Sequence, residues 1–249
     1  MTSLTKYGRA AVCILALLLA GPTLAGISGM ADRPAMWPSL QGKPTGLAPD
    51  PASTPEAVLQ VYGTRTLGWR GAFAEHTWIA AKRSGAPNYR TYQVVGWRHP
   101  ASRNRVVVLD EVPDQRWAGA KPRLYLDLRG EDIDALIDQV EAAVAAYPFK
   151  DSYRTWPGPN SNTFTAWVAR QMPDLRLDLP PTAIGKDYLG PTRLADSAPS
   201  GTGYQVSLFG LVGLLAAVEE GVEINLLGLT LGVDPLDLAV KLPGIGRLP

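Results

Sequence analysis

Apolar and polar residues alternate in five short runs in the first part of the globular region. Successive side chains of a strand point to opposite faces of a sheet, so this two-residue period predicts strands. Clusters of turn residues separate the runs, as is typical of short strands joined by loops. The runs span residues 56–66, 76–83, 89–98, 105–112 and 123–130.

The apolar period lengthens after the fifth run and predicts two helices. Apolar residues first recur at spacings of three and four, at Ile133, Leu136, Ile137, Val140 and Val144. Acidic residues in the first turn suit the helix dipole, and Pro148 should end this helix. A second helix follows the loop "WPGPN", with Phe164, Trp167 and Val168 on one face and Pro173 at its end.

The C-terminal residues 201–249 are rich in glycine and apolar residues, and we predict a hairpin there with a C-terminal surface extension. The hairpin should turn near residues 219–221. A membrane helix over 206–218 is the alternative, although that run is short for a bilayer. Strands followed by helices and then a hairpin favour an α+β fold, in which a mostly antiparallel sheet packs against helices in a core domain of residues 56–200.

The N-terminus has the pattern of a secretory signal. Lys6 and Arg9 precede the apolar run "AAVCILALLLA", and small residues follow around Ala25. An uncleaved membrane anchor is the alternative for residues 1–30, because the apolar stretch approaches the length of a bilayer span. In both cases we expect export, to the periplasm or to the membrane facing it. Residues 31–55 are rich in proline and glycine and predict a linker.

Composition excludes several kinds of chemistry. Cys13 is the only cysteine and lies in the apolar N-terminal run, which rules out intramolecular disulfides and a thiolate zinc site. The two histidines, His76 and His99, are not spaced like metal ligands, and no phosphate-binding glycine motif is present. We therefore expect no metal and no cofactor. The net charge of +1 argues against a nucleic-acid partner.

A hydroxyl and an imidazole are the candidates for catalysis. Ser161 stands at the start of the second helix, where helix-end amides can stabilise an oxyanion, and His76 at the start of a strand could accept its proton. Tyr153 and the amides near Asn162 could assist the oxyanion. Asp187 could orient the imidazole if its loop folds back.

A structural interpretation competes with this catalytic one. Asn160 or Ser161 could simply cap the helix, a role worth about 1 kcal/mol. His76 could be a buried, hydrogen-bonded histidine, and His99 precedes a proline as a turn residue would. The tryptophans are most simply explained as side chains that cover the sheet.

Long stretches of the sequence resemble a known family. They are "LQVYGTRTLGWRGAFAEHTWIAAK", "YPFKDSYRTWPGPNSNTFTAWVAR", "LDLPPTAIGKDYL" and "GVEINLLGLTLGVDP". Together they resemble a bacterial family known only as a domain of unknown function, number 3750, from Glu56 to the C-terminus. That resemblance implies no particular activity.

A more distant likeness comes from "NSNTF", residues 160–164, preceded along the chain by a strand histidine. It resembles the "NCxxF" helix start of circularly permuted papain-like folds, such as the lecithin retinol acyltransferase group and permuted NlpC-type peptidases. The likeness implies a permuted papain-like core, with serine in place of cysteine. Serine is the poorer nucleophile, so the site either works as a serine enzyme or has lost its chemistry.

Three functional hypotheses follow. The first is a serine-dependent hydrolase or acyltransferase of the cell envelope that acts on an amide or ester, with peptidoglycan peptide or lipid as substrate and with Ser161 and His76 as catalytic residues. The second is a non-catalytic binding or scaffold module that uses the same groove, with Asn160, Asn162 and Asp187 as binding residues. A membrane-associated structural protein is a third, with the glycine-rich hairpin as its packing surface. The oligomeric state is not predicted by the sequence.

Overall fold

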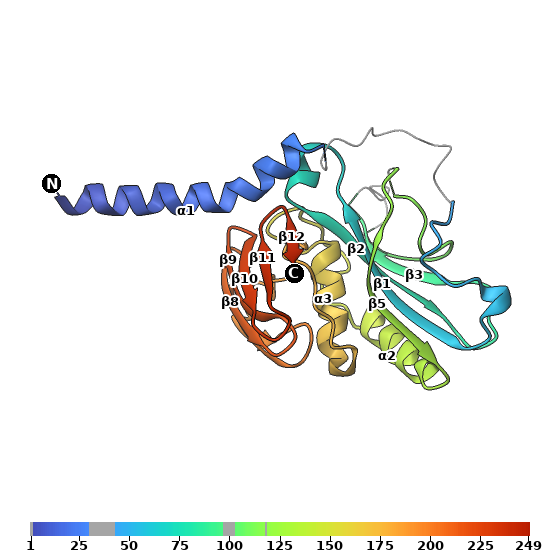
Figure 1. Ribbon diagram of the computed structural model, residues 1–249. Helices are drawn as coiled ribbons and strands as arrows, with labels where there is room; N and C mark the ends of the chain where they lie inside the picture. Colours follow the sequence, from blue (N-terminus) through green and yellow to red (C-terminus); the bar gives the residue numbers. More distant parts are fainter. Residues whose placement is uncertain (1, 30–42, 97–102, 118) are drawn as a thin grey trace.

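The computed structural model describes residues 2–29, 43–96, 103–117 and 119–249. His99 lies outside these ranges, as does the first part of the predicted linker, residues 31–42. Within them, two antiparallel sheets lie on either side of one buried helix, α3, and a long helix, α1, projects from the body (Figure 1). The α+β class predicted from the sequence is therefore correct.

The first sheet contains all five strands that the alternating runs predict. They are antiparallel and arranged in the order β4-β3-β2-β1-β5. Their bounds are β1 Ala57–Arg65, β2 Glu75–Lys82, β3 Arg90–Val94, β4 Val106–Asp110 and β5 Arg123–Gly130. Both faces of β1 and β2 are buried, so the two central strands have no solvent-facing side.

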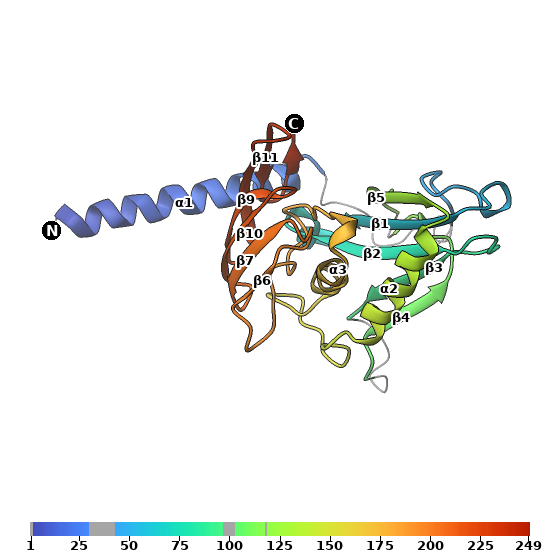
Figure 2. The ribbon, with the colours of Figure 1, turned by 90° about the horizontal axis from the view of Figure 1, so that it is seen from below.

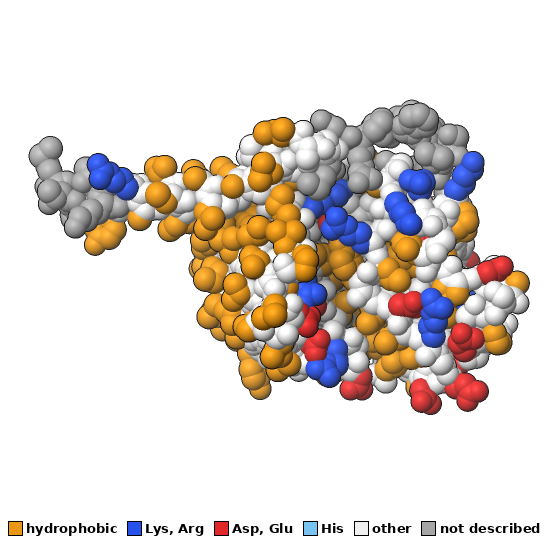
Figure 3. All heavy atoms as spheres, viewed as in Figure 1, with side chains coloured by type: hydrophobic (Ala, Val, Ile, Leu, Met, Phe, Trp, Pro, Cys, Tyr) orange, Lys and Arg blue, Asp and Glu red, His pale blue; other side chains and the backbone are white. Residues whose placement is uncertain are grey.

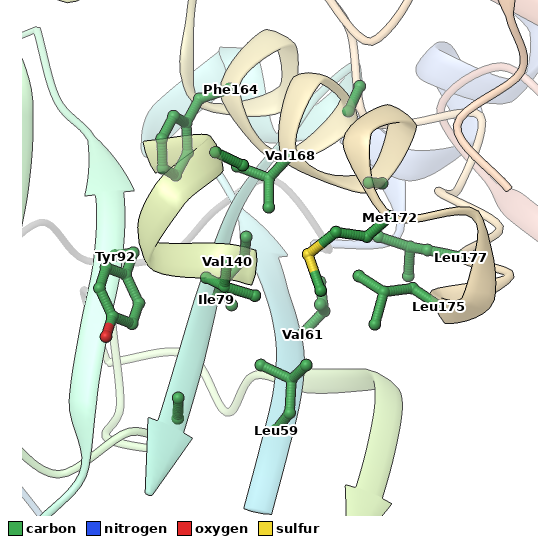
Figure 4. Close-up of a cluster of buried hydrophobic side chains, with 14 of the residues drawn as sticks. Leu59, Val61, Ile79, Tyr92, Val140, Phe164, Val168, Met172, Leu175 and Leu177 are labelled. Atoms are coloured by element: carbon green, nitrogen blue, oxygen red, sulfur yellow. The ribbon is translucent and has the colours of Figure 1, made fainter. Parts of the chain in front are cut away.

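The main core lies between this sheet and two helices, α2 (Ile133–Ala145) and α3 (Ser161–Gln171). Figure 4 shows Ile79 and Val61 of the sheet facing Val140 of α2 and Val168 of α3. Three short 3-10 helices complete the helical elements of the described residues: η2 (Pro51–Ser53), η3 (Gly68–Ala72) and η4 (Pro173–Leu175). The predicted amphipathic stripe of α2 is thus its buried face.

The opposite face of the first sheet carries a smaller cluster of Tyr62, Trp78 and Ala80. Part of the predicted linker covers it. The buried carboxylate of Asp114 accepts hydrogen bonds from the backbone amides of Thr45 and Leu47, at 3.0 and 2.8 Å. The end of the predicted linker is therefore bound to the domain and does not hang free of it.

The C-terminal region forms a second sheet of seven antiparallel strands, in chain order from β12 to β6 (Figure 2). The strands are β6 Ala195–Ser197, β7 Gly203–Leu208, β8 Val212–Ala217, β9 Gly221–Leu226, β10 Leu229–Asp234, β11 Ala239–Leu242 and β12 Gly246–Leu248. The predicted hairpin is the β8-β9 pair, and it lies at the centre of a larger meander. The predicted surface extension is instead made of β11 and β12, where Lys241 is fully buried.

Helix α1 (Thr2–Ile27) includes an apolar stretch, Tyr7–Ile27, that is long enough to cross a membrane. Its last turns pack on the body. Gly21 lies so close to the β11-β12 turn that a Cβ there would stand 1.9 Å from the Pro243 carbonyl oxygen, and Ala25 packs on Ala72 of η3. The preceding turns make almost no contact with the body and extend away from it (Figure 1).

Candidate functional site

A cavity of about 600 Å³ lies where the start of β2 meets the N-terminus of α3. This volume falls within the range of small-molecule binding sites. Five of the six predicted site residues line it: His76, Tyr153, Asn160, Ser161 and Asn162. They come from three separate segments of the chain, so the fold brings together residues that the sequence keeps up to 86 positions apart.

Asn160 is the residue that caps α3. Its side-chain oxygen accepts hydrogen bonds from the amides of Asn162 and Thr163, at 3.0 and 3.1 Å. The Thr163 hydroxyl accepts the Asn160 amide in return, at 3.1 Å, which completes a capping box. The predicted N-cap role therefore belongs to Asn160, and Ser161 is the first residue inside the helix.

Asn162 fastens the start of α3 to the sheet. Its side-chain nitrogen donates to the carbonyl oxygens of Glu75 and Ile184, at 2.9 and 2.8 Å, and its side-chain oxygen accepts the Thr77 hydroxyl at 2.9 Å. Both N–H donors and the oxygen of this buried amide are thus engaged. Asn162 thus sets the position of the helix end relative to β2.

Ser161 is the polar residue at the helix end whose hydroxyl is uncommitted. Within the described part of the chain, this hydroxyl makes no hydrogen bond, although the residue is only 3% exposed and lines the cavity. A hydroxyl at a helix N-terminus lies in the positive end of the helix dipole. Its position thus suits a contact with an acceptor or a carbonyl carbon of a bound molecule.

His76 lies on the other side of the sheet from α3. In β2, Thr77, Ile79 and Ala81 point to α3 and the main core, so His76 and Trp78 point the opposite way. Glu75 and His76 both line the cavity because they begin the strand, where the cavity reaches side chains from both faces.

Ring stacking and an amide hydrogen bond contribute to holding the His76 ring. It stacks on Trp117 at 4.9 Å between ring centroids, and its Nε2 atom lies 2.9 Å from the Gln93 side-chain oxygen. Since an amide oxygen only accepts, Nε2 carries the proton and Nδ1 the lone pair. Burial lowers the pKa of His76 to about 4, only partly offset by the hydrogen bond to Gln93, and so keeps the ring neutral at pH 7. Among the described residues, no hydrogen bond joins His76 to Ser161.

Tyr153 lines the same cavity, whereas Asp187 does not. The Tyr153 ring covers Gly96 so closely that a Cβ there would lie 2.5 Å away, and burial raises the pKa of its hydroxyl. Asp187 is buried between α3 and the second sheet, where it accepts the side-chain amides of Gln205 and Asn225 at 3.1 and 2.7 Å. The loop that carries Asp187 does not deliver it to the cavity or to the imidazole.

Sequence reasoning did not single out the aromatic lining or Glu75. The aromatic side chains that join His76 and Tyr153 around the cavity are Trp69, Phe73, Trp117 and Trp156. Glu75 also lines the cavity and points to the same side of β2 as α3 does. Its buried carboxylate pairs with Arg65 at 3.4 Å and Arg123 at 3.8 Å, and accepts the Tyr125 hydroxyl. The sequence feature that could have indicated this lining is the set of aromatic residues between the predicted strands.

The described residues contain no group of three or more His, Cys, Asp or Glu side chains placed to hold a metal ion. The carboxylate in the cavity wall, Glu75, is paired with two arginines. The arrangement can enclose an apolar or aromatic group and offer it one hydroxyl at a helix end.

Fold and cavity thus define an α+β protein with an aromatic-lined cavity beside a capped helix N-terminus. The chain belongs to the family described as "Protein of unknown function (DUF3750)", whose model matches residues 56–188, just over half of the sequence. The match covers the first sheet, α2 and α3, and ends before the second sheet. No curated protein and no solved structure matches the chain, so the permuted papain-like core remains a prediction.

Proposed function

We propose that this protein is an exported, membrane-anchored protein of the cell envelope whose cavity binds the apolar part of a lipid-like ligand. The cavity is the observation that carries the proposal, since most of its wall is aromatic and aliphatic, with polar side chains such as those at the start of β2 and the N-terminus of α3 set into it. Apolar walls with a small number of convergent polar groups are the usual composition of ligand sites.

The position of the cavity opening supports a ligand that arrives from a membrane. Trp69 and Leu227 line the cavity and are also 72% and 60% exposed, so they form an apolar rim. Trp69 lies in η3, the same short helix on which the end of α1 packs. A ligand that leaves the bilayer beside α1 would meet this rim first.

Retention of α1 is part of the proposal. A cleaved signal helix needs no fitted contact with the mature domain, yet Gly21 and Gly244 allow the backbones of α1 and the β11-β12 turn to touch. The basic residues Lys6 and Arg9 precede the apolar run Ala10–Ala20, so the positive-inside rule leaves them in the cytoplasm and exports the body.

Binding is favoured over catalysis by the position of His76. The base of a serine enzyme must come within reach of its hydroxyl. The His76 ring stands on the opposite face of β2 from α3 and is bonded to Gln93. Trp117 and Trp78 stack on that ring and restrict its rotation toward α3.

A serine hydrolase or acyltransferase is the second candidate, favoured by the uncommitted Ser161 hydroxyl at the end of α3. In such a reaction the Ser161 oxygen attacks an ester or amide carbonyl, a base takes its proton, and the alcohol or amine leaves with that proton. Water or an acceptor alcohol then releases the acyl group. A lipid ester or a peptidoglycan peptide is the corresponding substrate class.

Photo-crosslinking tests the binding proposal. The full-length protein is reconstituted in vesicles with a diazirine-labelled fatty acid, and the crosslinked peptides are mapped by mass spectrometry. We expect labels on residues 69–76 and 153–162. Ala74→Phe should abolish them by filling the cavity, while Ala142→Phe on the exposed side of α2 should retain them. Labels confined to α1 in the unaltered protein would contradict the proposal.

Ser161→Ala separates the two candidates. A binding protein keeps its crosslinks in this variant, because the hydroxyl contributes little to an apolar wall. An enzyme loses turnover and loses its labelling by a fluorophosphonate probe, which reacts with activated serines. Stoichiometric labelling of Ser161 in the unaltered protein would therefore favour the catalytic candidate.

A further inference from the structure

The second sheet has inverted polarity. Its face toward α3 carries the polar and charged residues, such as Gln205 and Glu223, both 2% exposed. Its outer face carries the apolar ones, such as Val206, Leu214 and Ile224, which are 51%, 48% and 49% exposed. An antiparallel sheet with one side in water ordinarily shows the reverse pattern.

The strand register gathers these outer residues into continuous rows. One row is Tyr204, Ala216, Val222, Val233, Val240 and Leu248. The next row is Val206, Leu214, Ile224 and Leu231. Neither row contains a charged residue. Apolar patches of this extent on a folded protein mark a surface that contacts a membrane or another protein.

Three turns of this sheet also carry large apolar side chains. Phe209, Leu227 and Leu238 stand in turns with positive φ angles of 55°, 56° and 52°, and their side chains are 41%, 60% and 82% exposed. Glycine, asparagine and aspartate are the residues that adopt this backbone region readily. Large apolar side chains there are strained and exposed, which suits a turn that meets an apolar medium.

Helix α1 identifies that medium. In both ribbon views α1 leaves the body on the side toward which the outer face of the second sheet looks, away from α3 (Figures 1 and 2). Figure 3 shows hydrophobic side chains gathered along α1 and over this sheet, while most charged ones lie over the rest of the body. One membrane thus faces both apolar surfaces.

A bilayer span by α1 would bring the body to the membrane surface. Its apolar stretch Tyr7–Ile27 has 21 residues, about the number that a bilayer needs. The last seven, Gly21–Ile27, belong to the part packed on the body, and they amount to roughly 10 Å of helix. A full span therefore draws the docking region, which includes the β11-β12 turn of the second sheet, to the depth of the membrane surface.

We propose that the outer face of the second sheet rests on the bilayer that α1 spans, with its apolar rows and turns in the interfacial layer. The exposed aromatic residues Trp69 and Tyr204 suit that layer, where aromatic side chains collect. The proposal does not depend on what the cavity binds.

Depth-dependent quenching tests it on the full-length protein. Cys13, the only cysteine, is replaced by serine, and single cysteines are introduced at Leu214, Ile224 or, as a control, exposed Glu131, two residues before α2. Each is labelled with the fluorophore NBD and reconstituted in phosphatidylethanolamine–phosphatidylglycerol vesicles. We expect lipids that carry a shallow nitroxide to quench the labels at Leu214 and Ile224, and aqueous iodide to quench the label at Glu131.

Two results would overturn the proposal. Iodide quenching at Leu214 and Ile224 equal to that at Glu131 would show that the face lies in water. Protection from both quenchers, together with a dimer in chemical crosslinking, would show that a second copy covers the face. Two labelled sites in one row keep the test decisive. If one cysteine variant fails to fold, its result will disagree with that of the other variant.

Discussion

The two sheets bury opposite kinds of side chain toward the same interior. The first sheet packs apolar residues such as Leu59 and Ile79 against α2 and α3. The second sheet turns Glu223 and Lys241 inward and leaves Ile224 outside. The first sheet is therefore stabilised by removal of apolar surface from water, whereas the apolar face of the second sheet remains exposed.

The interior of the second sheet is held by paired charges. Glu223 receives Lys241 at 2.8 Å and also Lys186, and all three side chains are at most 2% exposed. Burial would raise the pKa of Glu223, but the two lysines outweigh it and lower that pKa. Burial likewise disfavours the charged form of Lys186, but Glu223, Asp187 and Asp178 raise its pKa on balance. A buried ion pair of this kind fixes geometry at a large desolvation cost.

Removal of the central carboxylate should break this arrangement most severely. Glu223→Ala leaves two buried lysines without their shared partner, and we expect a loss of about 3–5 kcal/mol in the free energy of unfolding. Urea unfolding of the detergent-solubilised protein measures it. Glu219→Ala, in the preceding turn and paired on the surface with Arg176, is the control and should cost at most about 1 kcal/mol. Equal losses in the two variants would refute the role given to the buried charges.

The first sheet should respond to lost volume and not to lost charge. Leu59→Ala removes a fully buried side chain from the main core and should cost about 2–5 kcal/mol. Because no ion pair is involved, this loss should be the same in low and high salt and at pH 6 and 8. A strong salt dependence of the Leu59→Ala effect would contradict the contrast between the sheets.

His76 should make the first sheet sensitive to acid. Its pKa falls from 6.5 in the unfolded chain to about 4 in the folded one, so the unfolded state binds the proton more tightly between these values. The contribution of neutral His76 to the free energy of unfolding is complete above pH 6.5 and is lost as the pH falls to 4. For a pKa shift of this size, the loss is about 3 kcal/mol. His76→Phe keeps the stacking on Trp117 and should flatten this part of the stability profile. An unchanged slope would place the acid sensitivity elsewhere.

The sequence predicted the first sheet well because its pattern is local. Residues 123–130 coincide with β5, and the stripe of α2 needs only the helical period. The face of β2 on which His76 lies could not be predicted, since both faces of that strand are buried and each carries polar and apolar residues alike. The partners of Asp187, 18 and 38 residues away, follow no local pattern either. The second sheet alternates clearly, but its period does not say which face is inward, and the usual assumption gives the wrong one.

The cap of α3 separates the two residues that the sequence left as alternatives. Asn160→Ala removes the side chain that accepts the Asn162 and Thr163 amides and should cost about 1–2 kcal/mol. Ser161→Ala removes a hydroxyl without a hydrogen bond in the described residues and should change stability by less than about 0.5 kcal/mol. Thermal unfolding of both variants measures the difference. A larger loss of stability for Ser161→Ala than for Asn160→Ala would show that Ser161, and not Asn160, caps the helix.

The smallest effect on stability should come from the outer face of the second sheet, and it sharpens the comparison most. Leu214→Ser alters a half-exposed residue, so the unfolding free energy of the solubilised protein should change by less than about 0.5 kcal/mol. Leu215→Ser, the adjacent residue on the inner face, is 2% exposed and should cost several times more, because it leaves a cavity. If the two substitutions cost the same, the outer face is packed against protein, and the polarity of the second sheet has an explanation other than a membrane.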